Sequence, residues 1–249
     1  MTLSVQREPL FLAKPDAVIL DMDNCLYYYD SPHRVAMGAV IQKASEVLGV
    51  TEKRFLSAFS EARLEVKSQL RDTGSSHSRL LYFQRTFEIL GLKSQIIMSM
   101  DFEQTYWRTF LGNIELFSGV KELLFDLRNM DISIGVVTDL TSQIQFRKVV
   151  FLGLDNLIDY FVSSEEAGKD KPNAAPFKLI LDKMGLQGEK VWMVGDDPEK
   201  DIKGAKALKM VTLQKRHNGV KMLSGIDMPD AYFDEFEDLQ HFIQNRPWL

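Results

Sequence analysis

Short apolar runs alternate with segments of helical periodicity along most of this chain, and that alternation limits its fold more than any other feature. The runs are typical of buried β-strands, and the intervening segments carry apolar residues at helical spacing. Such alternation predicts an α/β fold, with a parallel sheet covered by helices on both faces. The predicted strands are 17–20, 132–137, 158–163, 190–194 and 210–213.

Three connecting helices can be placed by the signals at their ends. One is predicted to begin after Ser118 and a second after Thr141, because Ser and Thr side chains cap helix N-termini. A third should begin near Asn173, with Pro176 in its first turn, and end at Gly185. These helices are predicted to be α/β crossovers.

A long insertion separates the first predicted strand from the second. Residues 21–131 fill this interval, far more than the dozen or so that a parallel crossover needs. The segment 31–110 is rich in helix formers and nowhere alternates with period two. We therefore expect a core domain of residues 1–30 and 111–249, carrying a small helical domain of residues 31–110.

Composition is that of an ordinary globular protein, with 45% hydrophobic and 26% charged residues. Thirty Lys and Arg against 35 Asp and Glu give a net charge of -5, which argues against a nucleic-acid polymer as the main partner. No apolar stretch approaches the roughly 20 residues of a membrane span, and we expect no secretory signal, because the apolar patch near the N-terminus is too brief. The single cysteine, Cys25, cannot form an internal disulfide. We expect a cytoplasmic protein without a membrane partner, and the oligomeric state stays open.

Acidic residues follow the first and the fourth predicted strands: Asp21 and Asp23, then Asp196, Asp197 and Asp201. Ligands of open α/β sheets bind outside the carboxyl ends of strands, so these acids are expected in one cavity. Several carboxylates form a hard oxygen site suited to Mg²⁺, and the four histidines show no zinc-ligand spacing. Plainer interpretations stay open, namely solvated acids at a strand end and helix capping by Asp201 and its neighbours.

Two further polar residues follow the second and third strands. The hydroxyl of Thr138, with the backbone N–H groups after it, can hold phosphoryl oxygens at the start of a helix. The ammonium of Lys171 could neutralise charge on a transferring phosphoryl group. Taken singly, a Thr or Lys in such a loop is more often a helix cap or a solvated charge.

In chain order, the four strands are followed by Asp-x-Asp, Thr, Lys-Pro and Gly-Asp-Asp-x-x-x-Asp. This order resembles the haloacid dehalogenase superfamily of phosphohydrolases over essentially the whole chain. The resemblance implies a Rossmann-like core, and the helical insertion is similar to the C1-type cap of these proteins. The segment 23–27 (Asp-Asn-Cys-Leu-Tyr) resembles the start of pyrimidine nucleotidases, whereas 163–168 and 195–205 resemble sugar-phosphate and nucleotide phosphatases generally.

The resemblance implies a Mg²⁺-dependent phosphomonoesterase that acts on a small phosphorylated metabolite, either a nucleoside monophosphate or a sugar phosphate. Asp21 would attack phosphorus and form an aspartyl-phosphate. Asp23 would protonate the leaving oxygen and then accept a proton from water. The carboxylates of Asp21 and Asp196 and the backbone carbonyl of Asp23 would hold Mg²⁺.

The same resemblance implies supporting roles for other residues. Thr138, Lys171 and the backbone N–H of Asp139 would bind phosphate oxygens. Asp197 and Asp201 would orient Lys171 or metal-bound water.

The sequence departs from the family pattern at two positions. Asp139 stands where Asn is usual, and we expect its carboxylate to turn away from the phosphate. Cys25 stands where Thr is usual, and we expect an unreactive thiol, because the neighbouring acids hold its pKa up.

Other functions stay open on the same core. A phosphomutase would share its residues, a 2-haloacid dehalogenase would use the same first aspartate, and a noncatalytic binding module would keep only the fold. Substrate choice is expected to fall to the helical insertion. Candidate contacts there are the hinge tyrosines 27–29, which could also simply pack, and three residues that could bind a second anionic group or be plain loop charges: Arg71, His77 and Arg79.

Overall fold

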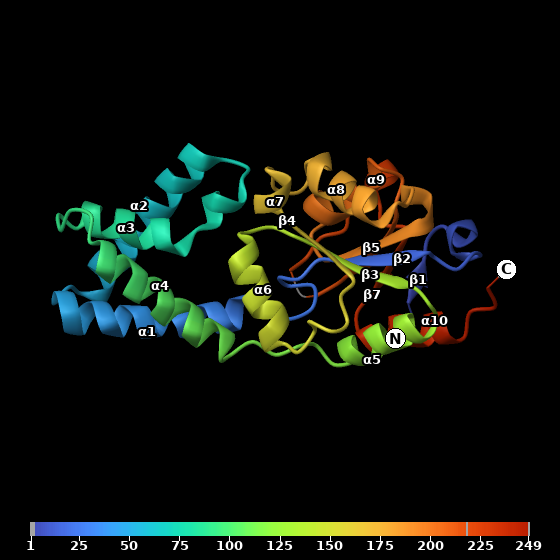
Figure 1. Cartoon of the computed structure of the whole chain (residues 1–249), viewed down its shortest axis with the longest axis horizontal. Helices are drawn as coiled ribbons and strands as arrows, with labels where there is room; N and C mark the ends of the chain where they lie inside the picture. Colours follow the sequence, from blue (N-terminus) through green and yellow to red (C-terminus); the bar gives the residue numbers. More distant parts are fainter. Residues whose placement is uncertain (1–2, 218, 249) are drawn as a thin grey trace. The chain divides into compact units, whose positions relative to one another are not determined.

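The computed structural model describes residues 3–217 and 219–248, and it contains a seven-stranded sheet (Figure 1). The strands are β1 (Ser4–Val5), β2 (Ala17–Leu20), β3 (Ser133–Thr138), β4 (Tyr160–Ser163), β5 (Val191–Gly195), β6 (Val211–Lys215) and β7 (Ala231–Phe233). Their order across the sheet is β1-β7-β6-β5-β2-β3-β4. All neighbouring pairs are parallel except β1 with β7. The predicted α/β fold is therefore confirmed.

All five predicted strands are present. Range 17–20 coincides with β2, and the others shift by one or two residues at their ends. The outer strands β1 and β7 were not predicted. They contain only 2 and 3 residues, too few to show a period-two pattern.

The chain forms two compact units. The core unit contains Met1–Tyr28 and Glu115–Leu249, and the helical unit contains Tyr29–Ile114. The sequence-based range 31–110 lies inside the helical unit, and its role as a cap stays a proposal.

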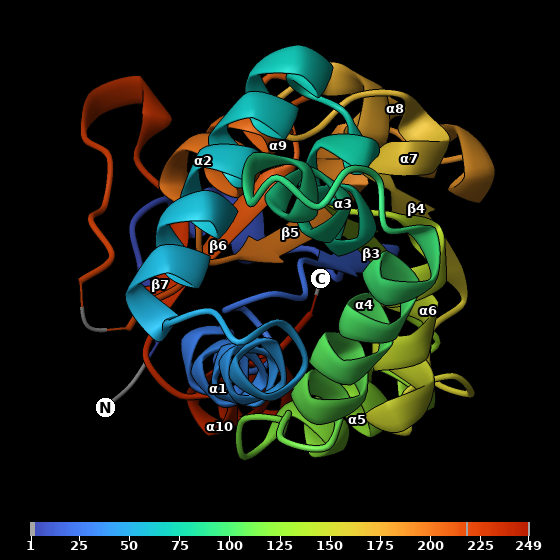
Figure 2. The ribbon, with the colours of Figure 1, turned by 90° about the vertical axis from the view of Figure 1, so that its left-hand side faces the viewer.

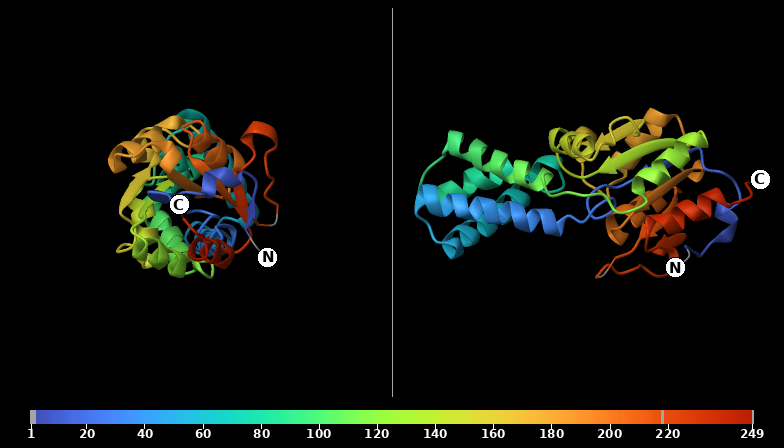
Figure 3. Two further views of the ribbon diagram at one scale, coloured as in Figure 1. Left: turned by 90° about the vertical axis from the view of Figure 1, so that its right-hand side faces the viewer. Right: turned by 90° about the horizontal axis from the view of Figure 1, so that it is seen from below.

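The sheet of the core unit carries helices on both faces. Helices α8 (Ala174–Met184) and α9 (Gly204–Lys206) cover one face, together with α7 (Ser164–Ala167). Helices α5 (Val120–Asn129) and α10 (Phe236–Gln244) lie side by side on the other face (Figure 3). Helix α6 (Ser142–Phe151) follows β3. Between the α8 face and the sheet lies a buried apolar cluster that includes Ile19, Phe177, Ile180 and Met193.

The predicted helix ends are partly confirmed. The Asn173 side chain accepts the N–H of Ala175 at the start of α8, and Gly185 ends that helix in the left-handed region (φ 66°). Helix α5 instead begins after Gly119, whose φ of 79° only glycine adopts readily, so the prediction of Ser118 as its cap is wrong. Thr141 occupies the N-cap of α6, but its side chain makes no capping hydrogen bond.

The helical unit consists of α1 (Asp30–Leu48), α2 (Glu52–Leu70), α3 (Arg79–Ile89) and α4 (Ile96–Leu111), with a short turn η2 (Gly74–His77) before α3 (Figure 2). Aromatic rings fill its interior, where Phe59 contacts Phe83, and Phe102 lies edge-on to Phe83 and Phe87. No helix in the described part of either unit has the length and apolar character needed to span a membrane.

Candidate active site

The register of the sheet brings three strand ends to the same edge. Leu20, the last residue of β2, pairs with Val136 of β3 and with Val194 of β5. The loops that follow these strands therefore leave from one side of the sheet, as the carboxyl ends of parallel strands do. Asp21 and Asp196 begin two of those loops.

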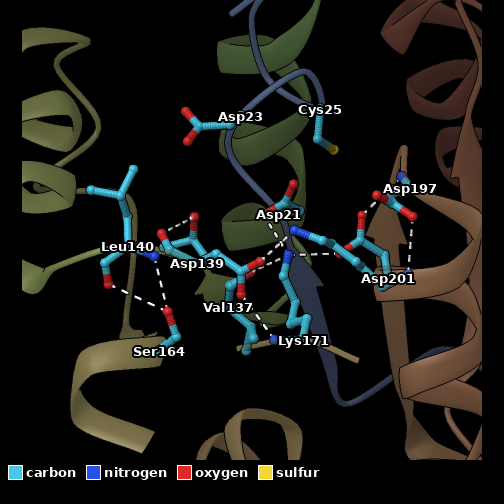
Figure 4. Close-up of polar contacts among 12 residues, drawn as sticks. Asp21, Asp23, Cys25, Val137, Asp139, Leu140, Ser164, Lys171, Asp197 and Asp201 are labelled. Atoms are coloured by element: carbon cyan, nitrogen blue, oxygen red, sulfur yellow. Dashed lines mark hydrogen bonds and ion pairs between the residues drawn. The ribbon is translucent and has the colours of Figure 1, made fainter. Parts of the chain in front are cut away.

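Lys171 joins the acidic residues of this edge (Figure 4). Its Nζ donates to Asp21 Oδ1 and to Asp201 Oδ1, both at 2.6 Å, and to the carbonyl oxygen of Val137 at 3.2 Å. The lysine is only 4% exposed, so these charges attract one another away from water. Burial opposes the ammonium form, but Asp201 and Asp21 outweigh it and hold the pKa of Lys171 well above its ordinary value. A fixed cation thus lies between two carboxylates.

Asp21, Asp196 and Asp201 each place one carboxylate oxygen within 4.8 Å of the other two. All three are buried. Burial raises the pKa of Asp21 to about 7 against the attraction of Lys171, and burial with repulsion from Asp21 raises that of Asp196 to about 8. Burial is the first cause of both shifts, and Lys171 is the cation that opposes them. A donor set of carboxylate oxygens fits a hard divalent cation such as Mg²⁺.

Gly195 allows Asp201 to approach the end of β5. A Cβ atom at Gly195 would lie 2.4 Å from Asp201 Cβ, so only glycine fits there. Asp201 Oδ2 also accepts the backbone N–H of Asp197 at 3.0 Å. The glycine and this hydrogen bond fix the carboxylate that contacts Lys171.

Asp197 is the helix cap of this loop. Its Oδ1 accepts the backbone N–H groups of Glu199 and Lys200, both at 3.0 Å. The helical turn that it caps is Pro198–Lys203 (η4). Of the acids that could cap this helix, Asp197 does so, whereas the Asp201 carboxylate contacts Lys171 and the backbone N–H of Asp197.

The negative charge of the Asp139 carboxylate is paired with the ammonium of Lys200. Oδ2 accepts from Lys200 Nζ and Oδ1 from the backbone N–H of Lys171, both at 2.9 Å. The Asp that stands where Asn is usual in the family is thus paired with a specific cation, Lys200. The next residue, Leu140, has a positive φ of 96° and donates its N–H to Ser164 Oγ at 2.9 Å (Figure 4).

Asp23 is held by a residue that the sequence analysis did not assign to the site. Lys148 Nζ of α6 donates to both carboxylate oxygens of Asp23, at 2.7 and 2.9 Å, and Tyr27 Oη donates to Oδ1. The Asp23 carboxylate points away from Lys171 (Figure 4). Burial alone would raise the pKa of Asp23, but the Lys148 charge and these hydrogen bonds lower it.

Gln145, also on α6, is a second residue that sequence reasoning missed. Its Nε2 donates to Thr138 Oγ1 at 2.6 Å and to the Asp139 carbonyl oxygen at 2.7 Å. Gln145 and Lys148 are both fully buried. Their sequence signal is a pair of polar residues three positions apart, next to the apolar residues Ile144 and Val149 on a helix. His217 is a third residue that sequence reasoning missed, and its Nε2 lies 3.3 Å from Asp196 Oδ2.

Comparison with known families identifies this architecture. Residues 15–209 match the family model described as haloacid dehalogenase-like hydrolase, which includes every acid, threonine and lysine discussed above. The chain belongs to this family. The resemblance inferred from the motif order is confirmed.

Curated relatives of this hydrolase are named phosphatases. This chain is 33% identical over 198 residues to a ribulose-1,5-bisphosphate 5-phosphatase from Halopiger xanaduensis. The match covers 79% of this chain and 83% of the relative. This chain is also 26% identical over 233 residues to a glyceraldehyde 3-phosphate phosphatase from Methanocaldococcus jannaschii, covering 92% and 96% of the two chains. The chain is a phosphatase of the haloacid dehalogenase-like family.

Solved structures of the family share this hydrolase's fold. A haloacid dehalogenase-type phosphatase from Thermococcus onnurineus aligns with a TM-score of 0.68 at 21% identity, over 94% of this chain and 100% of the other. The low identity limits this likeness to the fold.

Cys25 of the hydrolase is fully buried and lies near the acids. Its Sγ is 3.6 Å from the carbonyl oxygen of Val194. Burial and then the charge of Asp21 raise the thiol pKa well above its ordinary value, which is the direction expected from the sequence.

The hinge tyrosines and loop charges named from the sequence have separate surroundings. Tyr27 is buried beside Asp23, and Tyr28 is exposed and lies edge-on to Phe117. Arg71 is exposed at the end of α2, whereas Arg79 is half-buried within the helical unit. Whether any of them touches substrate stays a prediction.

His33 in the helical unit predicts a loss of stability in acid. Its Nδ1 lies 2.7 Å from Tyr106 Oη, and burial, then Arg79 and Arg63, lower its pKa to about 4. In the unfolded chain His33 is protonated below about pH 6.5, whereas in the folded chain it is protonated only below about pH 4. Acidification between these values therefore favours the unfolded state. We expect this residue to remove up to about 2 kcal/mol of stability between pH 7.5 and pH 5.

Thermal or urea unfolding of wild type and His33→Gln at both pH values measures this loss. The variant should lose less stability on acidification, and His241→Gln, an exposed position on α10, serves as the matched control. An equal acid loss in wild type and His33→Gln would contradict the assignment.

Proposed function

We propose that this hydrolase is a Mg²⁺-dependent phosphomonoesterase that cleaves a small phosphorylated sugar through an aspartyl-phosphate on Asp21. The observation that carries the proposal is the convergence of Asp21, Asp196 and Asp201 within 4.8 Å, with Lys171 Nζ 2.6 Å from two of them. An acidic cluster that can accept a cation therefore lies beside a fixed ammonium. Phosphoryl transfer needs both to stabilise charge on the transferred group.

In the first step, a carboxylate oxygen of Asp21 forms a bond to phosphorus while the bond to the sugar oxygen breaks. A sugar alkoxide is a poor leaving group, so Asp23 must carry the proton that this oxygen takes. Lys171 neutralises charge on the phosphoryl oxygens, together with Thr138 and the backbone N–H groups that follow it. Gln145, which holds the Thr138 hydroxyl, fixes this arrangement.

In the second step, water attacks phosphorus and the bond to Asp21 breaks, which releases inorganic phosphate. Asp23 accepts the proton of the water. Its contact with Lys148 favours the ionised form, which is the form that can accept this proton.

Mg²⁺ would be held by the carboxylates of Asp21 and Asp196 and the backbone carbonyl of Asp23. Asp197 and Asp201 would orient Lys171 or metal-bound water. Bound there, Mg²⁺ supplies electrostatic stabilisation of the phosphoryl charge. The gathering of three buried carboxylates around one lysine supports the presence of a further cation.

A sugar phosphate is favoured over a nucleoside monophosphate as the substrate class. The relatives that match this chain over most of its length are named for a pentulose bisphosphate and a triose phosphate. In the proposed mechanism the core residues act on the phosphoryl group, so they do not choose between these classes.

Phosphate release from a panel of triose, pentose and nucleoside phosphates tests the substrate class. The pentose or triose phosphates should give the largest kcat/KM. Turnover limited to nucleoside monophosphates would overturn the substrate assignment while leaving the chemistry in place.

Chelation tests the metal. Exhaustive treatment with EDTA should lower kcat by at least about 100-fold, because a metal ion supplies several kcal/mol of charge stabilisation. Mg²⁺ added back should restore turnover, and a hydrolase that keeps full activity after chelation would remove the ion from the mechanism.

A further inference from the structure

The side-chain amide of Gln145 on α6 is fully buried against the loop that follows β3. Its Nε2 donates to Thr138 Oγ1 at 2.6 Å and to the carbonyl oxygen of Asp139 at 2.7 Å. A carbonyl oxygen only accepts hydrogen bonds, so the amide nitrogen of Gln145, and not its oxygen, must face Asp139. The backbone therefore sets the direction of this amide, and Thr138 Oγ1 is the acceptor in its contact with Gln145.

This contact limits what the Thr138 hydroxyl can do with its own hydrogen. A hydroxyl has one hydrogen and two lone pairs, and the Gln145 amide occupies one of the lone pairs. The carbonyl oxygen of Asp139 competes for the hydrogen, but it lies 3.4 Å from Thr138 Oγ1, which is a long contact. The same carbonyl oxygen already accepts from Gln145 at the shorter distance. The hydroxyl hydrogen is therefore available to an oxygen atom outside this loop.

The Thr138 hydroxyl lies beside the cation of the candidate active site. Thr138 is buried and directly follows Val137, whose carbonyl oxygen accepts from Lys171 Nζ at 3.2 Å. The ammonium attracts an anion to this edge of the sheet. A hydrogen bond to an anionic oxygen is stronger than one to a neutral carbonyl oxygen, so a bound phosphate should take the Thr138 hydrogen.

Packing alone does not explain the glutamine at position 145. Among residues 3–217 and 219–248, no group donates a hydrogen bond to Gln145 Oε1, although this atom is buried. A buried acceptor without a donor destabilises the folded chain, so stability would favour an apolar side chain of similar length, such as methionine. The amide is therefore best explained by what its donor side does for Thr138 and Asp139.

We propose that Gln145 is a positioning residue that presents the hydroxyl hydrogen of Thr138 to an oxygen of the phosphoryl group. Gln145 acts through Thr138 and not by contact with the substrate. It donates to the hydroxyl oxygen and at the same time occupies the carbonyl oxygen that would otherwise attract the hydroxyl hydrogen. The inference rests on the proposed function and deepens it, because Thr138 is the phosphate-binding hydroxyl of that mechanism.

A double-mutant cycle on phosphate binding tests the inference. The measured quantity is the Kd of the full-length enzyme for inorganic phosphate, by calorimetry in the presence of Mg²⁺. Thr138→Val should raise this Kd about 10- to 100-fold, because it removes a hydrogen bond to a charged group. Gln145→Met should raise it about fivefold or more when Thr138 is present, and less than about twofold in the Thr138→Val background. Gln143→Met, at an exposed position on the same helix, should keep the wild-type Kd.

The cycle also separates positioning of the hydroxyl from a purely structural role. Gln145 holds the Asp139 carbonyl in a turn where Leu140 has a φ of 96°, and a loosened turn would weaken phosphate binding equally with and without the Thr138 hydroxyl. Equal weakening in both backgrounds, or no weakening in either, would overturn the inference. Circular dichroism of each variant confirms that it is folded, and Gln145→Leu repeats the cycle if the methionine variant does not fold.

Inorganic phosphate keeps this test distinct from that of the proposed function, because its binding needs no turnover. A wild type that binds phosphate and shows the expected cycle, but cleaves no sugar phosphate, would sink only the proposed function. A wild type that cleaves sugar phosphates but shows equal weakening in both backgrounds would sink only the role of Gln145. A wild type that binds no phosphate would overturn both.

Discussion

Replacing Asp21 by Asn should lower kcat for every phosphate ester by at least about 10⁴-fold, because the amide cannot form the aspartyl-phosphate. Asn has the shape of Asp and can still accept a hydrogen bond from Lys171 Nζ, which lies 2.6 Å from Oδ1 in the wild type. The fold should therefore persist. Stopped-time assays of phosphate release, with circular dichroism on the same sample, measure both quantities.

Asp16→Asn is the matched control for this variant. Asp16 immediately precedes β2, has a side chain that is 43% exposed, and pairs with Lys190 at 3.3 Å. Its replacement should leave kcat within about twofold of wild type, since an exposed ion pair contributes at most about 1 kcal/mol to stability. Retention of more than a tenth of wild-type turnover by Asp21→Asn would show that another group attacks phosphorus.

Much of the core unit could be predicted because its strands are buried on both faces. Continuous apolar runs such as 17–20 identify central parallel strands, and the residues that follow them fall at one edge of the sheet whatever the details of packing. This is why Asp21, Lys171, Asp196 and Asp201 could be placed together from the sequence. Strands β1 and β7 lie at one edge of the sheet and are too short to show a period-two pattern.

The remaining parts of the site depend on contacts that periodicity does not specify. Helical spacing indicates that Lys148 lies on α6, but not that this face meets Asp23, which is 125 residues away in the chain. The pairing of Asp139 with Lys200 likewise joins two loops that are 61 residues apart. The charge partners of an acid are therefore found from coordinates, even where its position is evident from sequence.

The contact between Lys148 and Asp23 bears directly on the chemistry of the second step. Lys148 is fully buried and keeps its ammonium within 2.9 Å of both carboxylate oxygens. An ionised Asp23 is a base that can accept the proton of the attacking water in the second step. The first step needs the protonated form of Asp23 when the leaving group is an alkoxide. The two steps therefore depend on Asp23 differently, and substrates with different leaving groups can separate them.

Asp23→Asn should lower turnover of a sugar phosphate by about 10²- to 10⁴-fold, the usual contribution of a general acid–base group. With 4-nitrophenyl phosphate, the leaving group needs no proton, so Asp21 should still be phosphorylated. Water then lacks its base, and the phosphorylated enzyme accumulates. Rapid mixing should show a burst of nitrophenolate near one equivalent of enzyme, followed by slow steady release. Equal losses for both substrates without a burst would mean that Asp23 serves binding or folding, because neither role distinguishes one leaving group from another.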